Sequence, residues 1–347
     1  MKVFKIEKRI VSQKYKPLII PEIGINHNGS LETAIKIVDA AKRAGAEIIK
    51  HQTHMPDFEM SVEAKKIKPG NSKRNIYDII LKSTLSEEDE YKLFRYVKKK
   101  GMIFLSTPFC REASDRLNRF GVNAFKIGSG EMNNIPLIDH ISKYNKPMIV
   151  STGMHSLKNV EKTVNFLKRK KANFALLHTT NLYPTPDHLV RLNSISQLKE
   201  KFPNTQIGLS DHTQSNISAI GAISLGASII EKHFTFNKKL KGPDHKSSID
   251  KLELIDLIKG VNANFLARGN NKTIHNQEKE IINWARESVV SIKDISKDEK
   301  LSKKNISTKR PTPKKNQIPA NKFFIVLGKK AKKNISANTI IKFRDIK

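Results

Sequence analysis

The stretch from residue 147 to 180, PMIVSTGMHSLKNVEKTVNFLKRKKANFALLHTT, decides the fold. Its two apolar runs, 147–153 and 174–180, flank a segment of helical periodicity over 156–170, which is the pattern of a strand–helix–strand unit. The same alternation extends in both directions and predicts eight strands, at 17–25, 47–52, 102–109, 124–130, 147–153, 174–180, 206–211 and 228–235. Further helical stretches lie at 31–46, 216–227 and 251–267. Eight alternating units without a leading glycine-rich dinucleotide turn favour a (β/α)8 TIM barrel over an open doubly wound sheet.

The segments before, between and after these units predict an N-terminal hairpin, one long connection and the domain boundaries. The first 16 residues alternate apolar and polar side chains and indicate a short hairpin that plugs the floor of the barrel. The segment at roughly 54–86 is longer than the other connections, so we expect a long loop at the catalytic end that acts as a lid. The predicted domains are a barrel over 1–267, a polar linker over 268–285 and a small β-rich domain over 286–347. We expect this last domain to have little core of its own and to dock on another surface.

Composition narrows the class of protein. A chain of 347 residues that is 38% hydrophobic can bury a sizeable core, and it has no apolar run of membrane-spanning or signal-peptide length. The single cysteine excludes an intrachain disulfide, and we expect a cytoplasmic protein. The net charge of +31 suggests an anionic partner, and residues 286–347 hold 18 basic against 5 acidic residues. Because the lysines are otherwise spread along the chain without interleaved aromatics, the pattern argues against nucleic acid as the primary partner.

Polar side chains stand at the carboxyl end of every predicted strand, where barrels of this type carry their catalytic groups. Lys50 and Lys126 each lie near a strand end between apolar residues, and two cations facing one mouth suit a phosphate and a carboxylate. The hydroxyls of Thr107, Ser129, Ser151 and Ser210 would complete a phosphate cradle. A Schiff-base lysine of the aldolase type remains the alternative.

Two histidines indicate a metal site. His212 and His233 end the seventh and eighth predicted strands, so their imidazoles can meet at one point and bind Mn²⁺, Fe²⁺ or Zn²⁺, with water and substrate oxygens as further ligands. The alternative is that one imidazole holds a backbone carbonyl while the other acts as a general acid or base.

A series of motifs resembles the sialic acid synthase family in order and spacing from about residue 17 to the end. They are PEIGINHNGS, IIKHQTHM, PGNSKRNIYDII, LSTPF, FKIGSGEMNNIPLI, MIVSTGM, HTTNLYPTP, VRLN, GLSDHT, EKHFT, GPDHKSS and STKRP. The resemblance implies an enzyme that joins phosphoenolpyruvate to an N-acetylated hexose and releases phosphate. It implies a (β/α)8 barrel followed by a C-terminal antifreeze-like (SAF) domain, a domain-swapped homodimer, and Mn²⁺ or another divalent metal such as Mg²⁺.

The resemblance also assigns residues. Lys50, Thr107, Lys126, Ser129, Ser151, Asn181 and Ser210 are similar to the phosphoenolpyruvate contacts, and His212 and His233 to the metal ligands. Glu22, Gln52, Asn71, Glu131, Tyr183, Glu231 and Asp244 resemble residues that hold or activate the sugar. Among these, the predicted catalytic groups are Glu22, Lys50, Lys126, Glu131 and Glu231. Arg310 resembles an arginine donated by the partner protomer, although TPKKNQIPA here replaces the glycine-containing stretch that commonly follows KRP.

The sugar acceptor stays open at this point. HQTH, PGN and IYDII resemble the versions in N-acetylneuraminate synthases, which use N-acetylmannosamine, and this is the leading prediction. GPDHKSS resembles the version in legionaminic acid synthases, so a legionaminic or pseudaminic acid synthase acting on a diacetamido-trideoxyhexose is the alternative. A polyanion-binding protein that uses the basic C-terminal domain is the alternative from a different class.

Overall fold

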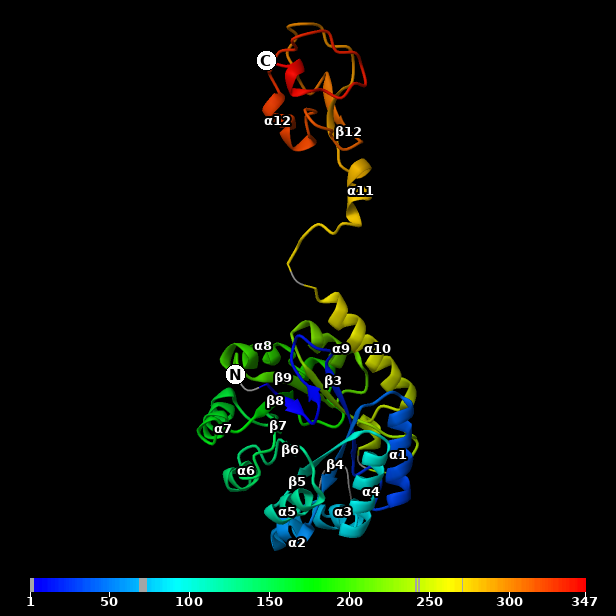
Figure 1. The fold of residues 1–347 in the computed structure, drawn as a ribbon, viewed down its shortest axis with the longest axis vertical. Helices are drawn as coiled ribbons and strands as arrows, with labels where there is room; N and C mark the ends of the chain where they lie inside the picture. The colour runs from blue at the N-terminus through cyan, green and yellow to red at the C-terminus, as the bar shows by residue number, and fades with distance from the viewer. Residues whose placement is uncertain (1–2, 69–73, 241, 243, 270) are drawn as a thin grey trace. The chain divides into compact units, whose positions relative to one another are not determined.

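Eight parallel strands close into a barrel in the computed structural model, which describes residues 3–68, 74–240, 242, 244–269 and 271–347 (Figure 1). The strands are β3 (Leu18–Gly24), β4 (Ile48–Thr53), β5 (Ile103–Pro108), β6 (Phe125–Ile127), β7 (Met148–Ser151), β8 (Phe174–Thr179), β9 (Gln206–Asp211) and β10 (Ile229–His233). They pair in chain order, and β10 closes the ring against β3 with Ile229 opposite Leu18 and His233 opposite Glu22. The predicted barrel is confirmed.

The two-residue period of the strands explains how the same segments build both the core and a polar mouth. In β7, Met148 and Val150 belong to the apolar layer between barrel and helices, whereas Ile149 belongs to the cluster in the lumen. The next inward position after Ile149 is Ser151, at the carboxyl end of the strand. The same alternation carries β4 from the lumen residue Ile48 to Lys50. The lumen is therefore apolar at its amino end and polar at its carboxyl end.

Amphipathic helices cover the outside of the barrel (Figure 1). They are α1 (Leu31–Arg43), α4 (Glu87–Lys99), α5 (Arg111–Phe120), α6 (Ile135–Ser142), α7 (Leu157–Arg169), α8 (Asn193–Lys201), α9 (Ile217–Ser224) and α10 (Lys251–Ala267). The side chains of Ser30, Ser86 and Ser156 cap α1, α4 and α7, and Asp250 forms a capping box with Glu253 at the start of α10. None of the helices in the described part of the chain is long and apolar enough to span a membrane.

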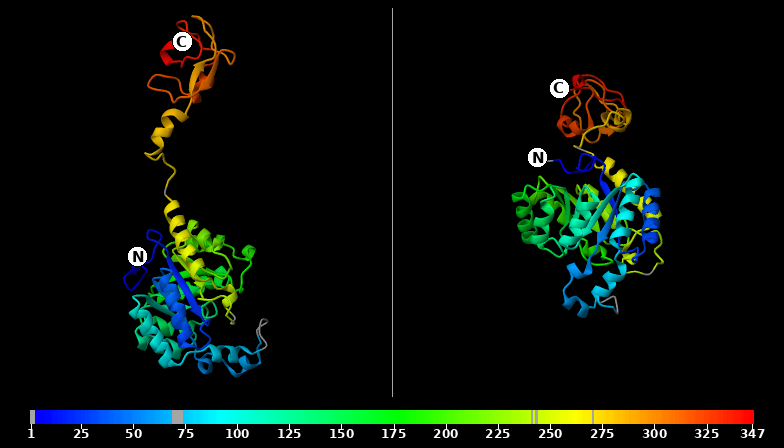
Figure 2. Two further views of the ribbon diagram at one scale, coloured as in Figure 1. Left: turned by 90° about the vertical axis from the view of Figure 1, so that its right-hand side faces the viewer. Right: turned by 60° about the horizontal axis from the view of Figure 1, so that its bottom comes forward.

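The N-terminal segment forms the predicted plug. Strands β1 (Lys5–Ile6) and β2 (Arg9–Ile10) pair as a small hairpin, and Phe4, Ile6 and Val11 join the apolar cluster inside the barrel. Figure 2 shows this hairpin at the end of the barrel opposite α2 (Pro56–Glu59) and α3 (Ile76–Ser83). Among the described residues, the hairpin therefore covers the amino end of the lumen and leaves the carboxyl-end mouth open.

The segment after β4 differs from the predicted long loop. It contains α2, the 3-10 turn η1 (Val62–Lys66) and α3, whose first turn is capped by the Asn75 side chain. The apolar residues of IYDII have helical spacing, and this periodicity over the eight residues of α3 is the signal that the loop prediction missed. Asn71 lies outside the described residues.

The chain divides into two compact units, residues 1–269 and residues 270–347. The second unit holds α11 (Glu278–Ala285) within the segment predicted as a linker, then β11 (Ser288–Ser291), β12 (Ile306–Lys309) and α12 (Phe323–Val326). The prediction that this unit has little core is wrong. Its many short pieces each contribute one or two apolar side chains to a common cluster: Val289, Ile295, Leu301, Ile306, Ile318, Val326, Ala331, Ile335, Ile341 and Ile346. The remaining short 3-10 turns among the described residues are η2 (Asp187–Leu189), η3 (His245–Ser247), η4 (Ala320–Lys322) and η5 (Phe343–Asp345).

Candidate active site

A cavity of about 210 Å³ occupies the carboxyl-end mouth of the lumen. Every predicted site residue of the barrel that the structure describes, except Asp244, lines it: Glu22, Lys50, Gln52, Thr107, Lys126, Ser129, Glu131, Ser151, Asn181, Tyr183, Ser210, His212, Glu231 and His233. The structure therefore brings together residues from all eight strand ends. Asp244 lies beside them, because its Oδ2 is 3.7 Å from His233 Nδ1.

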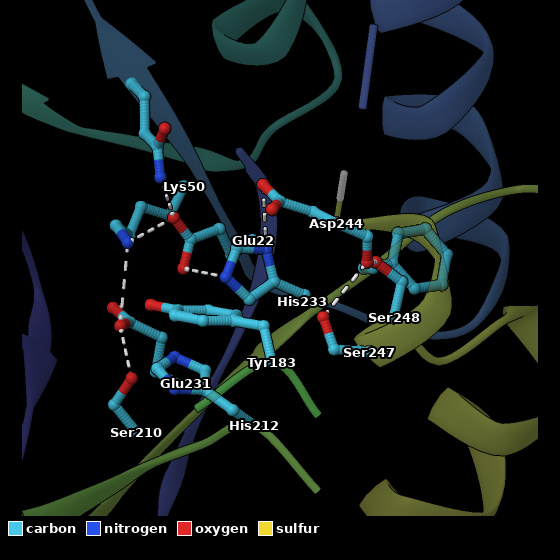
Figure 3. A network of polar contacts seen from close by, with 12 residues as sticks. Glu22, Lys50, Tyr183, Ser210, His212, Glu231, His233, Asp244, Ser247 and Ser248 are labelled. Atoms are coloured by element: carbon cyan, nitrogen blue, oxygen red, sulfur yellow. Dashed lines mark hydrogen bonds and ion pairs between the residues drawn. The ribbon is translucent and has the colours of Figure 1, made fainter. Parts of the chain in front are cut away.

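Two lysines and two carboxylates form a buried charge cluster at the centre of this cavity. Figure 3 shows three of its members, Lys50, Glu22 and Glu231. Lys50 Nζ is 2.5 Å from Glu22 Oε1 and 3.5 Å from Glu231 Oε1, and Lys126 Nζ is 3.6 Å from Glu231 Oε1. Lys126 also donates to Ser151 Oγ at 2.6 Å, and Ser210 donates to Glu231 Oε1 at 2.9 Å. The two lysines and the two carboxylates balance in charge, and an anion that binds Lys126 would compete with Glu231 for it.

The two lysines differ in their proton affinity. Burial would lower the pKa of Lys50, but the carboxylates of Glu22 and Glu231 hold it above its ordinary value. Burial lowers the pKa of Lys126 to about 8, and the charge of Lys50 adds to this effect while Glu231 opposes it. Burial would raise the pKa of Glu22, yet His233 and Lys50 hold it well below its ordinary value. Lys50 and Glu22 are therefore a firm ion pair, whereas Lys126 is the cation that can lose its proton near neutral pH.

Hydroxyl and amide groups surround the lysines. Ser129 Oγ accepts a hydrogen bond from the backbone N–H of Gly153 at 3.1 Å, and Thr107 and Asn181 line the same wall. Position 153 is glycine for a steric reason, because a Cβ there would collide with the Asn181 side chain. Glu131 also lines the cavity, and burial raises its pKa above the ordinary value.

The two predicted metal ligands lie side by side, with ring centroids 5.5 Å apart: His212 directly follows β9, and His233 ends β10. His212 Nδ1 donates to the Thr180 carbonyl at 2.9 Å, which leaves the Nε2 lone pair free, and burial lowers the pKa of His212 to about 3. His233 Nδ1 is buried without a hydrogen-bond partner, and its Nε2 is 3.6 Å from Glu22 Oε2. Tyr183 stacks on His212 at 4.1 Å (Figure 3).

These features fit a metal site with two protein ligands. His212 has the usual form of a metal-binding histidine, a neutral imidazole whose second nitrogen is held by a carbonyl. The unpartnered Nδ1 of His233 is a second nitrogen that could coordinate the ion. Within the described ranges, no group of three or more His, Cys, Asp or Glu side chains is arranged to hold a metal ion. An ion here would take its remaining ligands from water or substrate, as the sequence predicts.

Arg310 belongs to the other unit. It is exposed, and its guanidinium carbon lies 5.1 Å from the ring centroid of Trp284. Stacking on an aromatic ring holds the planar guanidinium in one orientation while leaving its N–H donors available.

The site also contains residues that the sequence prediction missed. Phe109, Gly128 and Gly130 line the cavity, and His54 contacts the cavity residue Gln52 at 3.2 Å. Phe109 directly follows β5, so its place after a strand end could have identified it. His54 lies beyond the end of β4, in a segment that was predicted as loop.

A larger cavity of about 440 Å³ lies outside the lumen, beside the start of α7. Its buried histidine, His178, donates to the Val190 carbonyl at 2.6 Å, and the pocket shares only Thr179 with the lumen cavity. It contains no buried ion pair, so the lumen cavity remains the candidate active site despite its smaller volume.

Comparison with known proteins places this site in a family. Residues 37–273 match the NeuB family and residues 286–347 match the SAF domain. The chain is 38% identical over 335 residues to N,N'-diacetyllegionaminic acid synthase of Campylobacter jejuni, covering 94% of this chain and 99% of that protein. It is 36% identical to pseudaminic acid synthase of the same species, covering 95% of this chain and 96% of that protein. The crystal structure of N-acetylneuraminic acid synthetase from Leptospira borgpetersenii is similar with a TM-score of 0.74 and 28% identity, covering 81% of this chain and 95% of that chain. The chain belongs to the NeuB family of sugar acid synthases and carries a C-terminal SAF domain.

Proposed function

We propose that the lumen cavity condenses phosphoenolpyruvate with the open-chain aldehyde of an N-acetylated amino sugar, giving a nine-carbon 2-keto-3-deoxy sugar acid and phosphate. The observation that carries the proposal is one cavity with two buried lysines at one side and two buried imidazoles at the other. The lysines suit the phosphate and carboxylate of phosphoenolpyruvate, and the imidazoles suit a metal that meets the aldehyde. The names of the family members above support a sugar acid as the product.

The anionic substrate would bind at the lysine side. Lys50 and Lys126 neutralise its charge, and the hydroxyl and amide groups of Thr107, Ser129, Ser151, Asn181 and Ser210 supply hydrogen bonds. C3 of phosphoenolpyruvate bonds to the aldehyde carbon, water adds to C2, and phosphate leaves. Holding the enol phosphate and the aldehyde in one cavity would make their reaction effectively intramolecular.

The aldehyde would bind at the histidine side. His212 and His233 would hold Mn²⁺, or another divalent ion such as Mg²⁺, which polarises the carbonyl when bound. Glu22, Gln52, Glu131, Tyr183 and Asp244 are placed to contact the sugar, and the raised pKa of Glu131 suits a group that donates a proton to the forming alkoxide. Glu231, bonded to Ser210, is placed to accept a proton from the attacking water.

Measuring phosphate release from phosphoenolpyruvate with Mn²⁺ and each candidate acceptor tests this proposal. The relatives named above favour a diacetamido-trideoxyhexose, for which we expect the higher kcat/KM. N-acetylmannosamine is the second candidate, supported by the HQTH, PGN and IYDII motifs. No phosphate release above the acceptor-free control with either sugar would refute the proposal.

The proton affinity of Lys126 predicts the pH dependence. Because the Lys126 pKa is about 8, its cation is complete below that pH and is lost as the pH rises through it. We expect kcat/KM for phosphoenolpyruvate to fall above pH 8, by up to about tenfold per pH unit, while Lys50 stays charged. Lys126→Arg should remove this alkaline limb even if its maximum is lower. A wild-type profile that stays flat to pH 10 would contradict the assignment.

The resemblance further supports a homodimer whose sites are completed in trans by Arg310. Because the SAF unit has its own core, it does not need to dock on a barrel to be stable. The proposal of a shared site therefore depends on Arg310 alone. Mixing His212→Ala and Arg310→Ala after subunit exchange tests it. A shared site predicts a heterodimer with one intact mouth and activity that returns toward half the native value. Confirmed exchange without recovery would assign Arg310 to its own barrel or to no site.

A further inference from the structure

His54 forms a bridge between the active-site cavity and the segment that follows β4. Its Nε2 is 3.2 Å from Gln52 Oε1, and its Nδ1 is 2.9 Å from Glu59 Oε1. Its ring stacks on Phe109 with centroids 4.1 Å apart and an interplanar angle of 11°. The side chains of His54 and Glu59 are 5% and 4% exposed, so this bridge is shielded from water.

The partners of the bridge determine where its protons lie. Gln52 donates through Nε2 to Glu22 Oε1 at 2.7 Å, so its Oε1 faces His54 and must accept. A hydrogen bond to that oxygen needs a proton on His54 Nε2, and the Glu59 carboxylate, which also accepts from the Met55 N–H, needs one on Nδ1. With Glu59 ionised, both ring nitrogens of His54 donate, which is the hydrogen-bond pattern of an imidazolium. The other carboxyl group near it is Glu131, whose pKa the His54 charge lowers in opposition to burial.

We propose that His54, held by Glu59, is a positioning residue that fixes the amide of Gln52 and thereby the geometry of Glu22; the proposal rests on the proposed function. If the amide turned over, its oxygen would face the Glu22 carboxylate, which already accepts from Lys50 at 2.5 Å. Two hydrogen-bond acceptors, the Gln52 amide oxygen and the Glu22 carboxylate, would then face each other on the side of the cavity proposed for the sugar. The imidazolium prevents this because it offers Gln52 only a donor.

The same bridge connects substrate binding to the segment after β4. Glu59 ends α2, and Phe109 follows β5, so the imidazolium joins α2 to two strand ends. A change in the position of α2 would remove the Glu59 partner and weaken the hold on Gln52. Specificity for the sugar acceptor therefore depends on groups that do not touch the sugar.

A double-mutant cycle tests this role. His54→Phe keeps the stack on Phe109 and removes both hydrogen bonds, and we expect about a tenfold fall in kcat/KM for the sugar acceptor with KM for phosphoenolpyruvate within about twofold. Gln52→Ala should have a similar effect, and adding His54→Phe to it should cause little further loss. Fully additive losses would overturn the proposal. Glu59→Gln, which keeps the shape and removes the charge, serves if His54→Phe does not fold.

A matched control comes from another histidine–carboxylate pair. His140 Nε2 in α6 is 2.9 Å from Asp115 Oδ1 in α5, outside the lumen. His140→Phe should therefore leave the kinetics unchanged.

A measurement that needs no activity separates the two proposals. In ¹⁵N-histidine-labelled protein near pH 7, the His54 signals, identified by their loss in His54→Phe, should show both ring nitrogens protonated, and Glu59→Gln should shift them toward the neutral form. A neutral His54 in the wild type would overturn the inference even if the enzyme is active. Failure of phosphate release together with an imidazolium signature would refute only the proposed function.

Discussion

Replacing Lys50 with methionine should lower kcat/KM for phosphoenolpyruvate by about a thousandfold, roughly 4 kcal/mol of transition-state stabilisation. Lys50 neutralises Glu22 at 2.5 Å and Glu231 at 3.5 Å, so its loss removes an anion contact and also leaves two buried carboxylates less compensated. Steady-state phosphate release at varied phosphoenolpyruvate measures the effect. Lys126→Met should cause a smaller loss, because its charge is already partial near pH 8.

Lys146→Met is the matched control for Lys50→Met. Lys146 precedes β7 at the opposite end of the strand from the cavity and donates to Asn118 Oδ1 at 2.8 Å. It should keep kcat/KM within about twofold. If borohydride with either substrate traps a covalent adduct on Lys50 or Lys126, a Schiff-base mechanism replaces anion binding.

Removal of the divalent ion should abolish turnover, and added Mn²⁺ should restore it. His212→Ala should lose metal binding and activity together, while the free energy of unfolding of the metal-free protein changes by no more than about 2 kcal/mol, because the ring lies at a strand end in a polar cavity. Metal content, phosphate release and chemical denaturation measure the three quantities. The His140→Phe variant should bind metal as the wild type does. Full activity in a metal-free preparation would refute the assignment.

The barrel and most of its mouth were predictable from the sequence because one rule governs both. Because alternate residues of a strand face the lumen, Ala124 lies in its apolar part and Lys126, two residues later, lies in the polar mouth. A polar residue at the end of an apolar run, in step with this alternation, is therefore a predicted site residue. The same reasoning places Ser151 after Ile149.

Other features depend on contacts between distant segments, which periodicity does not encode. His54 stacks on Phe109, which follows a different strand, and the core of the SAF unit is assembled from single residues such as Val289, Leu301 and Ile341 on short pieces. The prediction that this unit lacked a core failed for that reason.

The pairing of β10 with β3 has a consequence for how the enzyme is made. Glu22 emerges from the ribosome among the first residues, but its neighbour His233 follows more than two hundred residues later. Until then the β3 edge toward β10 has no partner strand, and Glu22 and Lys50 lack the Glu231 carboxylate and the His233 imidazole. A nascent chain that stops before residue 229 therefore carries an unpaired strand edge and three of the four charged groups of the cluster, without Glu231. The ring, and with it the complete set of charged groups at its mouth, can therefore form only in the last stage of translation of the barrel, and not gradually as each unit is added.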